Sequence, residues 1–323
     1  MTEKHSLRID DTGFGDVRIL QDPETFCYGV DAVLLAGFAA ERLKGRSRPS
    51  RLCDLGTGNG IVPLILSHKT PIGDMWGIEV QEEIWRLAVK NAELNELEGR
   101  LHFLHANVRD IRTKPIECRS SGRQPEAACR AEHTEYPMPE EQSEPVVQSD
   151  ILAELGGSGS FDAVTMNPPY TAAGNGLPAG NEARTIARHE VAGSLEDFLR
   201  AASVLLKDKG HLFIVHRPSR LIDLCELSRK LRLEPRDMVF VSGKPKEKPN
   251  IVLMHCVRNG SRGLRILPEL YVREPDGSFS REMLKLYERE IPVQDAASEL
   301  LKERGISFCG RRMTYSPLKE KPV

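Results

Sequence analysis

The fold is decided by residues 161–170, which read Phe-Asp-Ala-Val-Thr-Met-Asn-Pro-Pro-Tyr. The apolar first part is typical of a buried strand, and the proline pair ends it. Because proline cannot continue a sheet ladder, we expect Asn167 at the carboxyl end of that strand. Open α/β sheets bind their ligands at this edge. A strand followed by an ordinary proline loop explains the tetrapeptide about as well, so the rest of the chain has to decide.

The chemistry of this tetrapeptide suits a planar amino group. The side-chain oxygen of Asn167 and the main-chain carbonyl of Pro168 can each accept one N–H, and Tyr170 can stack on an attached ring. The pattern therefore favours an acceptor that carries an exocyclic NH2.

A glycine-rich loop precedes this stretch in the chain. Residues 51–60 read Arg-Leu-Cys-Asp-Leu-Gly-Thr-Gly-Asn-Gly, which predicts a short buried strand turning into a helix over 61–68. The dinucleotide fingerprint would need a third spaced glycine where Ile61 stands. The loop instead suits a cofactor without a pyrophosphate, such as S-adenosylmethionine, although this signal is weak by itself.

Two further strand ends supply candidate cofactor contacts. Residues 75–80 form a predicted strand with Glu79 near its end, where the ribose hydroxyls of a nucleoside need a carboxylate. A surface acid at a strand end is the alternative for Glu79. The next predicted strand, residues 101–106, is followed by Asn107, where the edge of an adenine would lie.

Strands and helices alternate through most of the remaining chain, which predicts an α/β fold. Asp31 is a candidate N-cap for an apolar helix, and Ser194 is expected to cap a helix over 195–206. Further segments complete the pattern: strands at 17–21, 210–216, 238–241 and 251–257, and helices at 81–95, 218–230, 280–289 and 293–304.

Composition excludes several classes of protein. The 323 residues carry a formal charge of −2, but residues 207–248 hold eleven basic and six acidic side chains, which suits a phosphate-facing surface or a solvated rim. The seven cysteines are dispersed and include no C-x-x-C pair, so we expect reduced thiols and neither disulfides nor a metal site. No apolar run is long enough to span a membrane, and a cytoplasmic location is expected.

We divide the chain into three parts. Residues 1–48 are a lead-in of strand and helix on the substrate side, 49–272 are the catalytic domain, and 273–323 are a helical extension and tail. The catalytic domain is interrupted by residues 115–158, which are rich in Glu, Pro, Ser and Gly and hold nine acidic residues against three basic ones. Such a segment is expected to be disordered.

The motifs together resemble the class I S-adenosylmethionine-dependent methyltransferases of the tRNA(Val) adenine-N6 type. The resemblance rests on residues 26–36, 54–61, 77–81 and 167–170, completed by Ala-Arg-His-Glu at 187–190 and Val-His-Arg-Pro at 215–218. It implies a Rossmann-like sheet of seven strands, mostly parallel with one antiparallel strand and with helices on both faces. It also implies N6-methylation of an adenine in structured RNA, namely adenine 37 beside the anticodon of a valine tRNA.

The resemblance assigns roles residue by residue. Cofactor contacts fall on Asp54, Gly56, Gly58, Asn59, Gly60, Glu79 and Asn107, and the target base on Asn167, Pro168 and Tyr170. RNA contacts are expected at Phe26, Tyr28, Arg188, His189, Arg217, Lys244 and Lys246, with Lys248 beside them, although a loop histidine such as His189 is often bonded only to a nearby carboxylate. Family members usually carry Asp where this chain has Asn107, so weaker cofactor binding is expected.

Three alternatives remain at this point. A protein-glutamine methyltransferase acting on release factors uses the same tetrapeptide on a planar amide, but that family carries an N-terminal helical domain for which there is no room here. DNA adenine methylation would call for a separate base-recognition domain. A non-catalytic RNA-binding relative is disfavoured by the retained Asn167 and glycine loop. The sequence does not set the oligomeric state.

Overall fold

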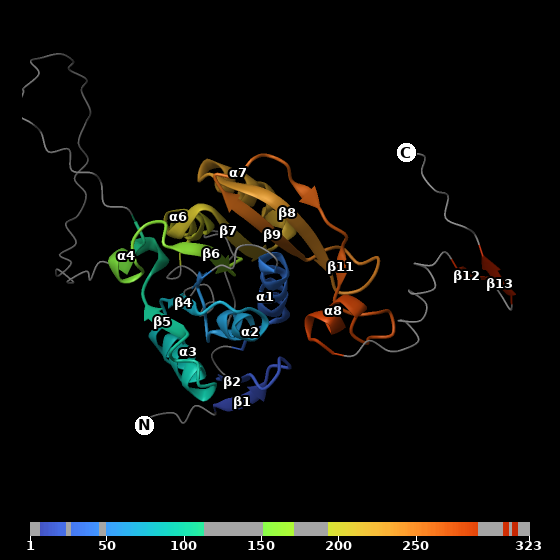
Figure 1. Cartoon of the computed structure of the whole chain (residues 1–323), viewed down its shortest axis with the longest axis horizontal. Coiled ribbons are helices and arrows are strands. Elements are labelled where there is room, and N and C mark those ends of the chain that lie inside the picture. The colour runs from blue at the N-terminus through green and yellow to red at the C-terminus, as the bar shows by residue number, and fades with distance from the viewer. Residues whose placement is uncertain are drawn as a thin grey trace, which may run out of the picture.

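A central nine-stranded sheet organises the computed structural model, which describes residues 7–23, 27–44, 50–112, 151–170, 193–289, 306–309 and 312–315 (Figure 1). Its strands are β3 (Arg51–Leu55), β4 (Asp74–Glu79), β5 (Leu101–His105), β6 (Phe161–Met166), β7 (Leu206–His216), β8 (Leu233–Ser242), β9 (Ile251–Arg258), β10 (Arg265–Ile266) and β11 (Leu270–Tyr271). The strand order is β10-β8-β9-β7-β6-β3-β4-β5, with β11 also paired to β8.

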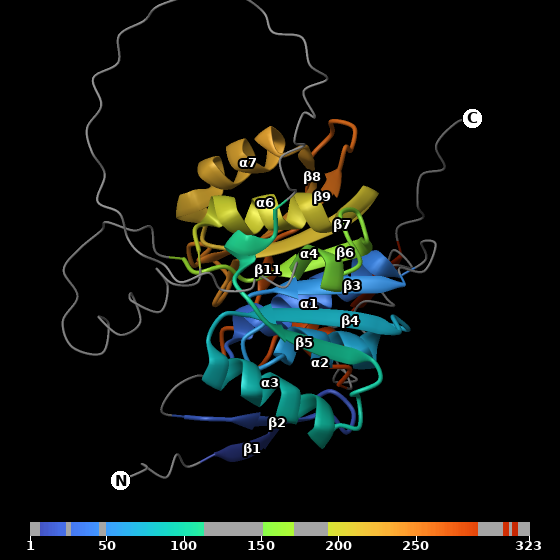
Figure 2. The same cartoon turned by 90° about the vertical axis from the view of Figure 1, so that its left-hand side faces the viewer.

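The seven long strands give a mostly parallel sheet. Strands β7, β6, β3, β4 and β5 run side by side in one direction, as Figure 2 shows. Strand β9 is antiparallel to both of its neighbours, β7 and β8. The predicted sheet, with one antiparallel strand, is therefore confirmed.

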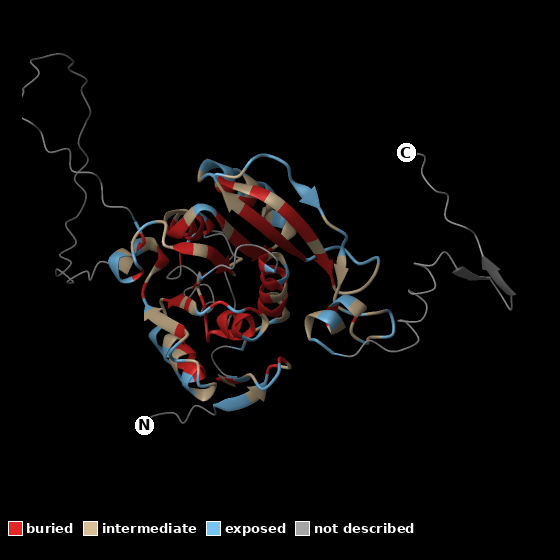
Figure 3. Ribbon diagram, in the orientation of Figure 1, coloured by how far each residue is buried: buried red, intermediate tan, exposed pale blue. Residues whose placement is uncertain are grey.

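Side chains alternate between two cores, one on each face of the sheet. In β7, Phe213 and Val215 join one hydrophobic cluster, whereas Leu212 and Ile214 join the other. The first cluster includes helices α1 (Val30–Leu43) and α2 (Ile61–Lys69); the second includes α6 (Leu195–Leu205) and Leu224 of α7 (Leu221–Lys230). The sheet and these helices hold most of the buried residues (Figure 3), which confirms helices on both faces.

A hairpin of β1 (Arg8–Asp11) and β2 (Arg18–Gln21) precedes the main sheet. It is joined to helix α3 (Glu82–Leu94) by Asn91, whose side chain accepts from the Leu20 N–H at 2.6 Å and donates to the Leu20 carbonyl at 3.0 Å. The N-cap of α1 is Gly29, so the expected cap at Asp31 is wrong. Asp31 instead lies in the first turn, where a carboxylate still interacts favourably with the helix dipole.

Several elements differ in extent from the expectation. Strands β7 and β8 each begin earlier than predicted. Leu206 of β7 pairs with Phe161 before the register shifts, and Leu233 of β8 pairs with Arg258. Smaller elements are η1 (Val108–Asp110), α4 (Ile151–Glu154), η2 (Pro218–Arg220), α8 (Arg281–Leu286) and the hairpin of β12 (Ile306–Cys309) with β13 (Arg312–Tyr315). Most of the 115–158 insertion and the helix expected at 293–304 lie outside the described residues.

Within the described ranges, no helix has the length and apolar character needed to cross a membrane. The same part of the chain holds no group of three or more His, Cys, Asp or Glu side chains arranged to bind a metal ion.

Candidate active site

The register of two adjacent strands brings the glycine loop and the Asn-Pro-Pro-Tyr segment together. Strands β3 and β6 are parallel, and Leu55 pairs with Met166 at their carboxyl ends. Gly56 and Asn167 are the next residues on the two strands. Because paired strands lie about 4.8 Å apart, both segments leave the sheet at the same place. Glu79 ends the neighbouring β4, whose Ile78 pairs with Leu55.

The glycine loop takes a backbone conformation that other residues rarely adopt. The φ angles of Gly56, Gly58 and Gly60 are +68°, +58° and +84°. A Cβ atom at Gly60 would also lie 2.8 Å from Cζ of Phe103. The glycines therefore serve the turn itself, and at Gly60 the neighbouring Phe103 leaves no room for a side chain.

Glu79 ties this loop to the next strand. Its carboxylate accepts the N–H of Gly58 at 3.0 Å and the N–H of Gln81 at 2.9 Å, and the residue is buried. Burial raises the pKa of Glu79, while these N–H donors act in the opposite direction. The carboxylate therefore orders the loop in addition to any contact with a ribose.

Asp54 is a second buried carboxylate beside the loop. Its Oδ1 accepts the hydroxyl of Thr165 at 2.6 Å, and the residue is 2% exposed. Burial raises the pKa of Asp54 to about 7, with the charge of Glu79 adding to the effect and the Thr165 hydrogen bond opposing it. Two carboxylates thus lie next to each other at one end of the sheet.

Asn59 presents an unusual polar group within the same loop. The residue is fully buried, yet neither its Oδ1 nor its Nδ2 has a hydrogen-bond partner among the described residues. Its carbonyl is engaged, because it accepts from Nδ2 of Asn91 at 2.9 Å. Buried amides are normally bonded, so an unpartnered one beside a glycine loop is the kind of group that a polar ligand would satisfy.

Asn107 follows β5 and caps the short helix η1. Its side-chain oxygen accepts the N–H of Arg109 at 3.0 Å. An aspartate would cap this turn in the same way, so Asn107 keeps the local fold.

Tyr170 joins the Asn-Pro-Pro-Tyr segment to helix α1. Its hydroxyl oxygen lies 2.7 Å from Oδ1 of Asn167 and 2.6 Å from Oδ2 of Asp31. Its ring meets His216 edge-on, with 5.3 Å between the ring centroids. Burial lowers the pKa of His216 to about 4, so this imidazole is neutral at physiological pH. Neither Asp31 nor His216 was expected from the sequence to belong to the site.

Arg217 lies against the same group from the end of β7. Its guanidinium carbon is 4.4 Å from the centroid of the Tyr170 ring, and its Nη2 is 3.6 Å from Oδ2 of Asp31. Its Nη1 donates to the carbonyl of Asn250 at 3.0 Å. Arg217, expected to meet phosphate, therefore also supports the tyrosine.

The remaining expected RNA contacts are distributed unevenly. Lys244 and Lys246 belong to the β8–β9 loop, which leaves the sheet beside the end of β7, because Val241 pairs with Ile251 and His216 with Val252. Tyr28 is partly buried against the core of α1 and α2. Phe26, Arg188 and His189 lie outside the described residues.

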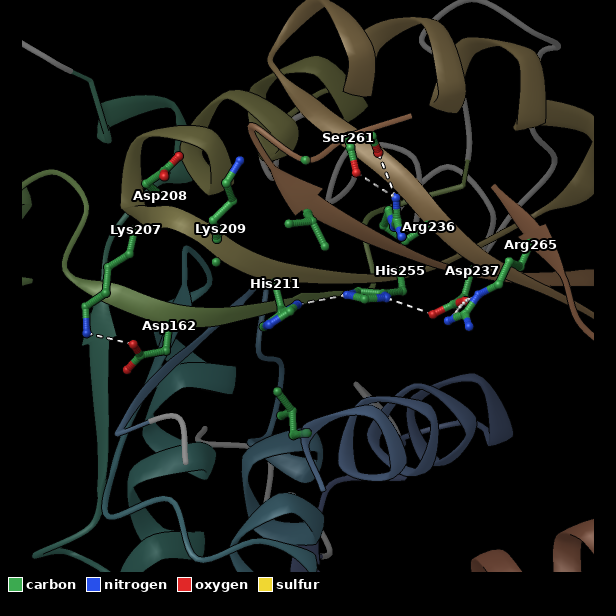
Figure 4. Close-up of a pocket in the computed structure, with 14 residues that line it drawn as sticks. Asp162, Lys207, Asp208, Lys209, His211, Arg236, Asp237, His255, Ser261 and Arg265 are labelled. Carbon is green, nitrogen blue, oxygen red and sulfur yellow. Dashed lines mark hydrogen bonds and ion pairs between the residues drawn. The ribbon is translucent and has the colours of Figure 1, made fainter. Parts of the chain in front are cut away.

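A separate cavity of about 690 Å³ lies at the opposite edge of the sheet, between the starts of β7 and β8 (Figure 4). None of the residues predicted for the site lines it. Its polar groups bond largely to one another: Lys207 to Asp162 at 2.7 Å, His255 to His211 and to Asp237 at 3.0 Å each, and Arg265 to Asp237 at 2.6 Å. We therefore place the candidate site at the carboxyl ends of the parallel strands, beside the glycine loop.

No protein-family model matches the chain, but individual known proteins are similar to it. A tRNA1(Val) (adenine(37)-N6)-methyltransferase of Porphyromonas gingivalis is 27% identical over 263 residues, which cover 80% of this chain and 86% of the relative. The protein of the same name from Flavobacterium johnsoniae is 23% identical over 76% of this chain and 84% of the relative.

The fold is shared with a solved structure described as a predicted O-methyltransferase of Agrobacterium tumefaciens. The TM-score is 0.55 at 20% identity, and the match covers 80% of this chain and 95% of that one. The resemblance found in the sequence and the class I methyltransferase fold are both confirmed.

Proposed function

We propose that this chain, a homologue of the tRNA1(Val) (adenine(37)-N6)-methyltransferases, transfers a methyl group from S-adenosylmethionine to N6 of an adenine in RNA, with adenine 37 of a valine tRNA as the target. The observation that carries the proposal is the pairing of Leu55 with Met166, from which the glycine loop and Asn167 both emerge. A methyl donor and a planar amine held at these two segments would be neighbours.

The residues at the loop fit the cofactor. We assign Glu79 to the ribose hydroxyls, Asn107 and the adjacent main chain to the adenine edge, and the side-chain amide of Asn59, which has no partner among the described residues, to a polar group of the ligand. Asp54 and Glu79 together give this end of the sheet a negative character that suits a cationic ligand. When bound, S-adenosylmethionine supplies an electrophilic methyl group on a positively charged sulfur.

Asn167 and Pro168 would act on the methyl acceptor by orienting its amino group. The lone pair of an aromatic NH2 is delocalised into the ring, so the amine is a poor nucleophile. If the Asn167 side chain and the Pro168 carbonyl accept its two N–H bonds, the nitrogen is drawn toward a tetrahedral geometry and its lone pair is directed to one side. Positioning of this kind can lower a barrier by several kcal/mol. The proton leaves after the methyl group has arrived, so no strong base is required.

An RNA surface next to this site is supplied by the β8–β9 loop. Lys244, Lys246 and Lys248 follow the end of β8, and the carbonyl of Asn250 in the same loop is bonded to Arg217. Base entry requires a nucleotide splayed from its stack, which is easiest in an RNA loop, and lysines beside the entry would bind the flanking phosphates.

Asn167→Ala tests the proposal most directly. We expect it to abolish transfer of a labelled methyl group to unmodified tRNA, while the Kd for S-adenosylmethionine changes less than about threefold, because the side chain contacts only the acceptor. Asn259→Gly removes an amide at the opposite edge, bonded to Asp208 at 2.8 Å, and serves as the control. Ribosomal RNA and release factor are offered in parallel, and the product is identified by nuclease digestion and mass spectrometry. Full activity of Asn167→Ala, or methylation of release factor alone, would refute the proposal.

The lysine loop is tested by the double variant Lys244→Ala/Lys246→Ala. We expect a higher KM for RNA with kcat nearly unchanged, and a shallower dependence of KM on salt, because phosphate contacts release counterions. Arg229→Ala/Lys230→Ala, which removes two charges from the last turn of helix α7, is the charge-matched control. An unchanged salt dependence in the double variant would show that RNA does not contact this loop.

A further inference from the structure

The hydroxyl of Tyr170 bridges two groups that come from distant parts of the chain. Asp31 lies in the first turn of α1, and Asn167 directly follows β6. The hydroxyl oxygen is 2.6 Å from the Asp31 carboxylate and 2.7 Å from the Asn167 side chain, so both contacts are hydrogen bonds by distance.

One phenol proton cannot serve two acceptors. A carboxylate can only accept, and it is a stronger acceptor than an amide oxygen, so the Tyr170 proton goes to Asp31. The 2.7 Å contact with Asn167 then requires an N–H from the amide. A half-turn of the Asn167 amide exchanges its oxygen and nitrogen at almost no change in shape, which places the NH2 toward Tyr170.

We infer that Asp31 is a positioning residue that acts through Tyr170 to hold the Asn167 amide with its oxygen turned away from the tyrosine, as an acceptor for the amine of the substrate. The identity of that amine rests on the proposed function. Without the carboxylate, Tyr170 would donate to Asn167 and occupy the oxygen that the substrate needs.

The surroundings of Tyr170 favour this arrangement. Arg217 approaches Asp31 to 3.6 Å and covers the tyrosine ring at 4.4 Å, so the acid has a cationic neighbour and the ring is held in place. The neutral imidazole of His216 packs edge-on against the Tyr170 ring. Burial raises the pKa of Tyr170, so the hydroxyl keeps the proton that it donates.

A double-mutant cycle tests the inference in the methyl-transfer assay. Asp31→Leu and Tyr170→Phe are each expected to lower kcat about 10- to 100-fold, the range expected for a hydrogen bond with a charged group, while the Kd for S-adenosylmethionine is unchanged. The double variant should be no slower than Tyr170→Phe. Glu41→Gln, an exposed acid on the same helix that pairs with Lys44, is the control. Losses that multiply in the double variant would mean that Asp31 acts independently of Tyr170, which overturns the inference.

A second measurement does not depend on activity. In protein labelled with 15N at asparagine side chains, the Asn167 signals are identified by their loss in Asn167→Asp. We expect one Asn167 amide proton to exchange slowly with solvent in the unsubstituted protein and quickly in Tyr170→Phe and Asp31→Leu. Fast exchange of both protons in the unsubstituted protein would overturn the inference. The slow proton in a protein that methylates no RNA would instead refute the proposed function and leave this arrangement standing.

Discussion

Asp54 should make the stability of the unliganded protein depend on pH in a way that one substitution removes. The residue is 2% exposed, and burial raises its pKa from 3.8 to about 7. Between these values the folded protein holds a proton that the unfolded chain has lost. The stabilising effect of this proton is complete below about pH 4 and is lost as the pH rises through 7.

The size of the effect follows from the two pKa values. The difference between 3.8 and about 7 corresponds to about 4 kcal/mol of unfolding free energy, which is an upper value because a bound water would reduce it. Asp54→Asn removes the titration and keeps an oxygen that accepts from Thr165. The variant should exceed the stability of the unsubstituted protein by about 1 kcal/mol at pH 4.5 and by up to about 4 kcal/mol at pH 8.

Urea unfolding followed by circular dichroism, at pH values from 4.5 to 8 without cofactor, measures this difference. Asp208→Asn makes the same change of charge on an exposed residue at the opposite edge of the sheet and controls for net charge. A difference between Asp54→Asn and the unsubstituted protein that does not grow with pH would show that Asp54 is not held protonated, and the reasoning from burial would be wrong.

Two further substitutions test what holds the glycine loop and helix α2. Gly60→Ala should cost at least about 1–2 kcal/mol, since its φ is +84° and the new Cβ meets Phe103, whereas Gly73→Ala, with no atom within 4 Å, should change the melting temperature little. Arg100→Met should cost about 1–3 kcal/mol, because the guanidinium donates to the carbonyls of Ser67, Thr70 and Ile72 at the end of α2. An unchanged melting temperature in either variant would contradict the corresponding contact.

Local features of the sequence predicted the turn after β3 and the start of helix α6. The glycine spacing after Asp54 predicted a turn, and all three glycines have positive φ. Ser194 predicted a helix start, and in the structure it forms a reciprocal capping box with Asp197. These features depend on neighbours within a few residues, so a single sequence is sufficient to find them.

Features that depend on distant residues were not predictable in the same way. Strand β1 has an exposed, charged sequence, and only its pairing with β2 makes it a strand. Asp31 and Tyr170 are separated by 139 positions, and a sequence pattern cannot show that their side chains meet. The N-cap of α1 was misplaced for a related reason, because Asp31 uses its carboxylate in that tertiary contact rather than in capping.

Two buried acids, Asp54 and Glu79, oppose folding at this end of the sheet when they are ionised. Burial opposes the charge on both Asp54 and Glu79, and the charge of Glu79 raises the pKa of Asp54 further, so Asp54 is the more costly to ionise. An apolar pair would fold more easily, but it would give no preference for a ligand with positive charge. A cationic nucleoside bound nearby would favour the ionised forms of both acids. Part of the free energy that opposes their ionisation would then be offset on binding. Asp54→Asn should therefore gain stability and lose affinity for S-adenosylmethionine together, which is the trade expected of a residue retained for binding.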